Sequence, residues 1–395
     1  MNRNTKNLPF FSPSIGKAEF RAVKRVMRSG WLTTGPEAAA FEREFAAVIN
    51  SAASRSSPPV QALAVNSATS GLHLSLEAAG IKAGDRVAVP SLTFTATAEI
   101  IQYLNARPVF IDSEKDTGNM SAESLAAARR ECLKNGHEIK AVIPVHLAGR
   151  PCNMKALRAA MEGSPAVFIE DAAHAFPSRT SEGMAGSLGD AGVFSFYATK
   201  TITTGEGGMV ISRNSEWMNR MRTMRLHGID REVWNRYRSA EKARSWEYDV
   251  TAPGFKYNMT DMAAAVGRVQ LRRSEKFLSA RKTLAAEYSR LLDNTPGLSI
   301  PRDETGHAWH LYIVRFSKPA QREQAAEALR QAGIGCSVHF IPLHRMTYWK
   351  NSCSLTPRHF PEAEYLADRI LSLPLWPGMP VGGVRRTAEI IRSVL

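Results

Sequence analysis

Cysteine is scarce in this sequence, and long hydrophobic runs are missing. The four cysteines among 395 residues are scattered, with no close pair. This spacing gives neither a disulfide framework nor a zinc knuckle, and it fits the reducing cytoplasm. No stretch approaches the ~20 consecutive apolar residues that a membrane span needs, and the polar N-terminus lacks the apolar core of a signal peptide. The sequence therefore predicts a cytoplasmic protein that does not enter a membrane.

Acidic side chains are too few to balance the basic ones. The chain has 51 Lys and Arg against 37 Asp and Glu, a net charge of +14. Positive charge can serve nucleic acid, a membrane surface or an anionic small substrate. The basic residues are widely spread, with no aromatic-interleaved stripe or recognition helix, so we expect no nucleic-acid partner. The excess positive charge then either lies on the solvated surface without a specific partner or helps to attract a phosphorylated substrate. The ten histidines show no HExxH-type pattern, so no metal site is predicted.

Short apolar strands alternate with amphipathic helices through most of the chain. We expect strands at 62–65, 86–90, 108–112, 141–146 and 166–170. Such alternation predicts an α/β fold with a doubly wound, mostly parallel sheet. A long helical stretch then runs from Thr260 towards Asp293. It leads into a smaller α+β region with strands at 310–316 and 336–341 and helices at 320–332, 361–371 and from about 385. We therefore predict two domains, residues 1–260 and 261–395.

Polar turns follow the predicted strands at residues 66–71, 91–94, 170–174 and 197–200. In doubly wound sheets, ligands bind beyond the carboxyl ends of the strands. We therefore expect these four turns to converge on one crevice.

Lys200 lies in a polar turn between two apolar strands, with threonines beside it and glycines following. Taken alone, it could be an exposed hairpin lysine, which is an unreactive cation. A lysine that is held in a site and loses its proton can instead attack a carbonyl and form a Schiff base.

The other turns offer further parts of a cofactor site, each with a plainer alternative. Small residues at 66–71 can hold a phosphate with backbone N–H groups and hydroxyls, or serve only as a helix cap. Phe94 can stack on a flat ring or pack in a core. Asp171 can keep a pyridoxal ring nitrogen protonated or cap a helix, beside a histidine, His174. Ser195 can add a phosphate contact or be an ordinary strand hydroxyl.

Along nearly its whole length the sequence resembles the DegT/DnrJ/EryC1/StrS family of sugar aminotransferases. The motifs that carry this resemblance are SGWLTTGP (29–36), PSLTF (90–94), IPVHLAG (143–149), EDAAH (170–174), FSFYATK (194–200), EGG (206–208) and KYNMTD (256–261). The resemblance implies the fold type I architecture of aspartate aminotransferase, pyridoxal 5'-phosphate as cofactor, and ping-pong transamination.

The resemblance also implies roles for single residues. Lys200 forms the Schiff base and carries the proton, Asp171 binds the pyridine nitrogen, and His174 contacts the cofactor's phenolic oxygen. Phe94 stacks on the ring. The phosphate contacts are Ala68, Thr69 and Ser195, with Asn258 reaching the phosphate of the neighbouring subunit's cofactor, which implies a homodimer. Ala68 departs from the family pattern, because many members have glycine there; the extra methyl is tolerated if its φ is negative.

For the substrates, the resemblance implies L-glutamate as amino donor and a nucleotide-linked 4-keto-sugar as acceptor. The stretches 252–258, 308–311, 333–335, 339–340 and 371–375 resemble the family branch that makes UDP-4-amino-4-deoxy-L-arabinose. His339 and His344 are candidates near the sugar, or structural histidines. A 3-keto-sugar or a cyclitol ketone stays open as acceptor.

Two other functions occur on the same fold. A sugar dehydratase of this kind has histidine at the lysine position, so Lys200 argues against it. A non-catalytic regulator would not need Lys200 and Asp171 together, and the chain shows no DNA-binding motif.

Overall fold

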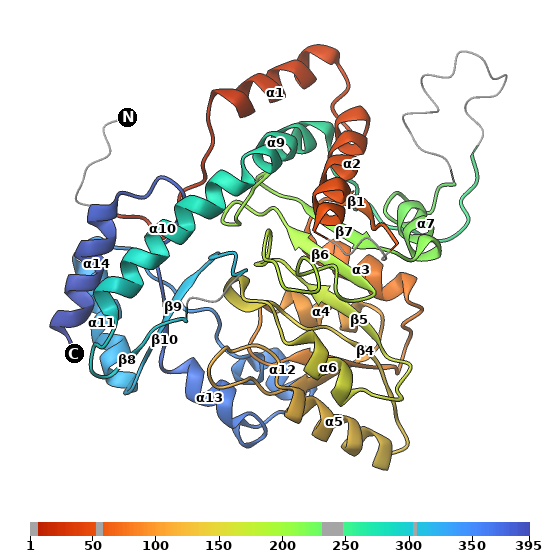
Figure 1. Cartoon of the computed structure of the whole chain (residues 1–395). Coiled ribbons are helices and arrows are strands. Elements are labelled where there is room, and N and C mark those ends of the chain that lie inside the picture. The colour runs from red at the N-terminus through yellow and green to blue at the C-terminus, as the bar shows by residue number, and fades with distance from the viewer. Residues whose placement is uncertain (1–6, 53–57, 231–247, 303–305) are drawn as a thin grey trace.

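Two sheets of unequal size organise the chain (Figure 1). The computed structural model describes residues 7–52, 58–230, 248–302 and 306–395. The large sheet has the order β1-β7-β6-β5-β4-β2-β3. Its strands are β1 (Gln61–Val65), β2 (Arg86–Pro90), β3 (Arg107–Ile111), β4 (Ile139–Val142), β5 (Val167–Asp171), β6 (Ala191–Ser195) and β7 (Gly208–Ser212). Only β7 runs against the others, so the predicted doubly wound, mostly parallel sheet is confirmed.

Helices cover both faces of this sheet, as its continuous apolar strands require. They are α1 (Lys17–Ser29), α2 (Pro36–Ser51), α3 (Ala68–Ala78), α4 (Ala96–Tyr103), α5 (Ala122–Lys134), α6 (Met154–Ala160) and α7 (Ser215–Met224). Phe41 and Phe45 of α2 pack against Phe194 and Phe196 on one face. The side chains of α3, α4 and α7 pack on the other face.

The second sheet is small and antiparallel, with the order β10-β9-β8. Its strands are β8 (Leu298–Ser299), β9 (Tyr312–Phe316) and β10 (Ile370–Leu373), and its helices are α10 (Ser274–Leu292), α11 (Pro319–Gln331), α12 (Thr347–Ser352), α13 (Pro361–Ala367) and α14 (Val381–Ser393). Helix α9 (Asp261–Arg272) packs on α1 and α2, whereas α10 packs on α14. In Figure 1, α9 and α10 thus lead from the large sheet to the blue C-terminal elements. The two-domain division at residue 260 stays a prediction.

Three predicted elements differ from those observed. The strand expected at 141–146 ends at Val142, because Pro144 has no N–H to continue the ladder. The strand expected at 336–341 is absent: Ser337 makes only an isolated bridge with Ser372. The helix expected at 361–371 ends at Ala367, because Ile370–Leu373 pair with β9 instead.

The N-terminal segment crosses to the small sheet. Leu8 exchanges backbone hydrogen bonds with Gly333 and Gly335 and packs in the core of this second part. This crossing brings Phe10 and Phe11 to the cavity described below. Within the described residues, no helix is both long and apolar enough to cross a membrane.

Candidate active site

A cavity of about 510 Å³ lies at the carboxyl ends of the parallel strands. The predicted residues that line it are Ala68, Thr69, Phe94, Asp171, His174, Ser195, Lys200 and His339. They come together because β1, β2, β5 and β6 all end at the same edge of the sheet, where β7 begins. The predicted convergence of the four polar turns is therefore confirmed.

Asp171 is the last residue of β5, and only 6% of it is exposed. Its Oδ2 accepts a hydrogen bond from the Thr97 hydroxyl at 2.8 Å, and its Oδ1 accepts one from the Ala173 backbone N–H at 3.1 Å. Burial raises the pKa of this carboxyl, while the two hydrogen bonds and the charge of Lys200 oppose the rise. A buried carboxylate at a cavity wall suits a cationic N–H partner, such as a protonated ring nitrogen.

Lys200 is held inside the cavity and is not an exposed hairpin residue. Its backbone N–H bonds to Tyr197 O at 2.9 Å, and the next residue, Thr201, donates to Phe176 O at 2.6 Å. Burial lowers the pKa of the Lys200 amine to about 8, and the Asp171 carboxylate limits that fall. The amine therefore reaches its neutral, nucleophilic form far more readily than a surface lysine does.

The start of α3 forms one end of the cavity. The Ser67 side chain accepts the Ser70 backbone N–H at 3.1 Å, while Ala68 and Thr69 line the cavity. Gly208 lets β7 approach this turn, since a Cβ there would lie 2.7 Å from the Ala68 nitrogen. Ala68 has helical backbone with negative φ, so its methyl causes no strain. The first N–H groups of a helix attract anions, which suits a phosphate.

These groups fit pyridoxal 5'-phosphate. The helix start suits the phosphate, and Asp171 suits the ring nitrogen. Lys200 offers an amine for the carbonyl, and Phe94, which is 59% exposed, presents an uncovered ring to the cavity. The cavity volume falls within the usual range for cofactor sites.

Histidines gather on the far wall of the cavity. His174 Nδ1 accepts the Ala148 backbone N–H at 3.3 Å, and His339 Nδ1 lies 2.9 Å from the Ser372 hydroxyl. Burial lowers the pKa of both imidazoles, that of His339 to about 4. His310, which the sequence placed only at a strand start, is the third member, with its ring centroid 4.4 Å from that of His174.

Two predicted residues do not line this cavity. His344, a candidate near the sugar, is instead buried, with Nδ1 2.6 Å from Ser91 Oγ and Nε2 2.5 Å from Glu364, so its role here is structural. Asn258 lies apart from its own chain's cavity, with its amide donating to the Thr34 hydroxyl at 2.6 Å.

Thr97 is a site residue that sequence reasoning missed. It follows Phe94 by one helical turn, and its hydroxyl also lies 3.1 Å from that of Thr93. Only the tertiary structure, which brings the Thr97 hydroxyl to the end of β5, shows that it holds Asp171. The aromatic residues Phe10, Phe11 and Phe340 were also missed, because their segments reach the cavity from the N-terminus and the small sheet.

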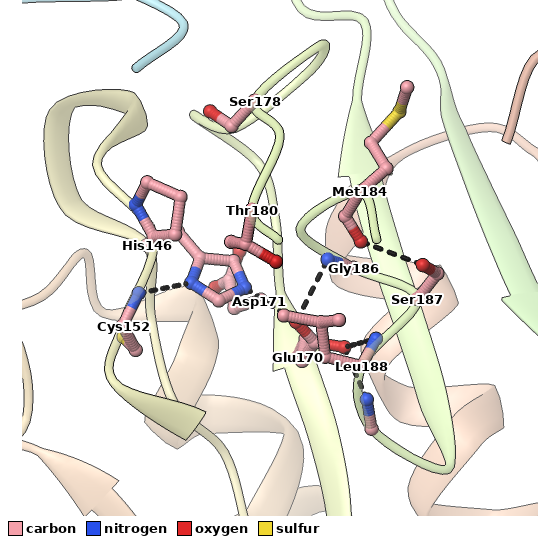
Figure 2. A network of polar contacts seen from close by, with 12 residues as sticks. His146, Cys152, Glu170, Asp171, Ser178, Thr180, Met184, Gly186, Ser187 and Leu188 are labelled. Atoms are coloured by element: carbon pink, nitrogen blue, oxygen red, sulfur yellow. Dashed lines mark hydrogen bonds and ion pairs between the residues drawn. The ribbon is translucent and has the colours of Figure 1, made fainter. Parts of the chain in front are cut away.

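Glu170, one residue before Asp171, points to the opposite side of β5 into a buried polar network (Figure 2). Its carboxylate accepts hydrogen bonds from His146 Nε2 at 2.7 Å and from the backbone N–H groups of Gly186 (2.8 Å), Leu188 (2.7 Å) and Gly189 (2.5 Å). The Cys152 backbone N–H donates to His146 Nδ1, so Nε2 carries the imidazole proton. Glu170 thereby ties the 186–189 loop to the strand that carries Asp171.

We expect Glu170→Ala to lower the free energy of unfolding by about 3–5 kcal/mol. The change leaves four donors without an acceptor, of which those of His146 and Gly186 are buried, and each buried donor costs about 1–3 kcal/mol before relaxation. Urea denaturation of the cofactor-free protein measures the effect. Glu182→Ala is the matched control, because Glu182 is exposed and should change stability by less than about 0.5 kcal/mol. Equal stability of the two variants would contradict the role of Glu170.

Comparison with known proteins agrees with this geometry. The model of the DegT/DnrJ/EryC1/StrS aminotransferase family matches residues 13–392. The spore coat polysaccharide biosynthesis protein SpsC of Bacillus subtilis is 39% identical over 394 residues, which cover 98% of this chain and 97% of SpsC.

Solved structures are similar over the same length. Spr1654 of Streptococcus pneumoniae in its PMP form has a TM-score of 0.89 at 30% identity, over 98% of this chain and 99% of that chain, and it is also known in a PLP form. The aminotransferase TlmJ of Streptoalloteichus hindustanus has a TM-score of 0.86 at 32% identity, over 98% of each chain. The chain therefore belongs to the DegT/DnrJ/EryC1/StrS aminotransferase family and is a pyridoxal phosphate-dependent aminotransferase of fold type I.

Proposed function

We propose that this protein moves the amino group of L-glutamate to a nucleotide-linked 4-keto-sugar in two half-reactions. The observation that carries the proposal is that Lys200 and Asp171 line one cavity at the carboxyl ends of β5 and β6. The printed name of SpsC, a polysaccharide biosynthesis protein, favours a sugar as acceptor. The net charge of +14 would attract the phosphates of a nucleotide carrier.

Each residue of the cavity has a proposed task. Lys200 is the covalent attachment point of the cofactor, and its Nζ takes the α-proton of the donor and returns it at the cofactor. Asp171, held by Thr97, keeps a proton on the ring nitrogen. When bound, pyridoxal phosphate supplies the electron sink that stabilises the negative charge left by the removed proton. His174 donates to the phenolic oxygen, and Phe94 covers one face of the ring.

The phosphate contacts complete the proposed site. Ala68 and Thr69 offer backbone N–H groups, and Ser195 offers its hydroxyl from the end of β6. We propose that Asn258 contacts the phosphate bound by the second subunit of a cytoplasmic homodimer. Its position outside its own cavity supports this, and so do Phe20 and Met27 of α1, which expose 68% and 61% of their surface for a second copy to cover.

A spectrum tests this function. The purified protein should show visible absorbance from bound pyridoxal phosphate, and L-glutamate should bleach it as the amino group is transferred. Adding nucleotide-linked keto-sugars one at a time should then restore the band, and the sugar that restores it is the acceptor. Sedimentation of the same sample gives the assembly. Protein that binds no pyridoxal phosphate, or a band that no amino acid bleaches, would refute the proposal.

The rate of cofactor capture should depend on pH through Lys200. Its pKa near 8 leaves roughly a tenth of the side chain as neutral amine at pH 7 and roughly nine-tenths at pH 9. Since only the neutral amine attacks a carbonyl, the rate at which apoenzyme captures pyridoxal phosphate should rise from pH 6 and level off above about 8.5. Stopped-flow absorbance measures it. A rate that still climbs at pH 10 would mean that Lys200 keeps an ordinary pKa.

A further inference from the structure

The cavity must bind the carboxylate of an amino acid, yet among the described residues that line it no arginine occurs. Lys200 is the only cation there, and it is committed to the cofactor under the proposed function. A carboxylate taken out of water needs N–H or O–H donors to replace its hydration. The donors that remain in the lining are Ser, Thr and Tyr hydroxyls and the imidazoles of His174, His310 and His339.

The hydrogen bonds fix the tautomer of His174 and allow the same one for His339. His174 Nδ1 accepts the Ala148 backbone N–H, so its proton lies on Nε2. The Ser372 hydroxyl lies 2.9 Å from His339 Nδ1 and can donate to this nitrogen, which leaves the His339 proton on Nε2. Both rings can therefore present an N–H on Nε2, the nitrogen not used by the protein.

His310 is a buried imidazole with an unpaired nitrogen. It is 5% exposed, and its Nδ1 is buried with no hydrogen-bond partner. An orphaned N–H is rarer in protein interiors than an orphaned acceptor. The imidazole proton is therefore assigned to Nε2, as in the other two rings. His310 lies close enough to His174, His339 and Lys200 for their charges to act on it.

Two features of the surrounding structure hold His310 at its position in the cavity lining. Trp309, just before it, has a left-handed φ of 51°, which is strained for a bulky residue. The buried Arg281 guanidinium donates to the carbonyl oxygens of Trp309 (3.1 Å), His310 (3.1 Å) and Leu375 (2.8 Å). Strained backbone and a buried cation are costs that persist mainly where function requires a side chain to be held.

From this arrangement we propose that His310 and His339, through their Nε2–H groups, bind the α-carboxylate of the amino donor in place of an arginine. This inference rests on the proposed function. The carboxylate is bonded to the carbon whose proton Lys200 takes, so its binding groups must line the same cavity as Lys200, as these two do. His174 is left for the cofactor's phenolic oxygen. Neutral donors also let the carboxylate leave easily before the acceptor enters the same space.

Titration of the holoenzyme with L-glutamate, followed by the loss of visible absorbance, gives an apparent dissociation constant. We expect His310→Phe, which keeps a ring but has no N–H, to raise it at least about tenfold, the usual effect of losing a hydrogen bond to a charged group. His310→Gln, which restores an N–H, should recover most of the affinity. His339→Phe should behave like His310→Phe. All three variants should keep the unliganded cofactor spectrum.

A binding measurement without turnover separates this inference from the proposed function. Calorimetric titration with glutarate, a dicarboxylate that cannot react, should show the same loss in His310→Phe and the same recovery in His310→Gln. Unchanged affinity in His310→Phe for both ligands would overturn the inference, and so would loss of bound cofactor in that variant. A wild-type holoenzyme that binds glutarate through His310 but is bleached by no amino acid would instead refute the proposed function alone.

Discussion

Replacing Lys200 by alanine is expected to lower kcat for transamination by at least about a thousandfold. The change removes the covalent attachment of the cofactor and also the general base, and positioned proton transfer alone contributes about 10²- to 10⁴-fold. The folded cavity offers no ready substitute, since Lys200 is the only amine among the described residues that line it. Single-turnover bleaching by L-glutamate measures the rate constant directly.

Lys200→Arg is the control for charge. It keeps a cation beside Asp171 but cannot attack a carbonyl, so it should be as inactive as the alanine variant. A small primary amine added to Lys200→Ala should restore part of the proton transfer and show that the site is otherwise intact. An alanine variant within tenfold of the wild-type rate would contradict the role given to Lys200.

Asp171→Asn is expected to lower kcat by roughly 10²- to 10⁴-fold while leaving the fold intact. The amide keeps the shape and the hydrogen bond with Thr97 but cannot hold a proton on the ring nitrogen. Removing one partner of a buried ion pair costs about 3–5 kcal/mol, and a loss of that order in the transition state gives the expected fall in rate. Rates of the glutamate half-reaction test it, with far-UV circular dichroism as the check on folding.

The matched variant is Asp171→Glu, which keeps the charge and moves it by one methylene. It should retain more activity than Asp171→Asn, because charge matters here more than shape. If the two variants were equally impaired, position would be the dominant requirement. If neither lost activity, the ring nitrogen would not depend on Asp171.

Much of the large sheet follows from local pattern. β2 was predicted at its observed bounds, because the apolar run from Val87 to Pro90 has few other ways to be buried. The local sequence pattern predicted the wrong element where a single residue ends a strand or where a strand far away in the sequence supplies the hydrogen bonds. Pro144 ends β4, and Ile370–Leu373 become a strand only because β9 offers hydrogen bonds that a local view of the sequence does not contain.

The residues of the site also fall into those that the sequence predicted and those that only the structure revealed. The roles of Lys200 and Asp171 were predicted because each lies in a short motif that follows a strand. The placement of Thr97, Phe10 and His310 could not be predicted, since each depends on packing between segments far apart in the chain. His344 shows the opposite case: a histidine near a site motif in sequence proved to be held by Ser91 and Glu364, outside the cavity.

The sequence by itself determined the alternation of strands and helices around the large sheet and the four polar turns. It also determined that a lysine and an aspartate follow neighbouring strands, because alternating apolar runs and turn residues are local properties. Only the tertiary structure decided that Lys200 lines the same cavity as Asp171, with a pKa near 8. It also decided that three imidazoles line the same cavity. Burial and electrostatic proximity depend on which segments pack together, and that is a property of the folded chain.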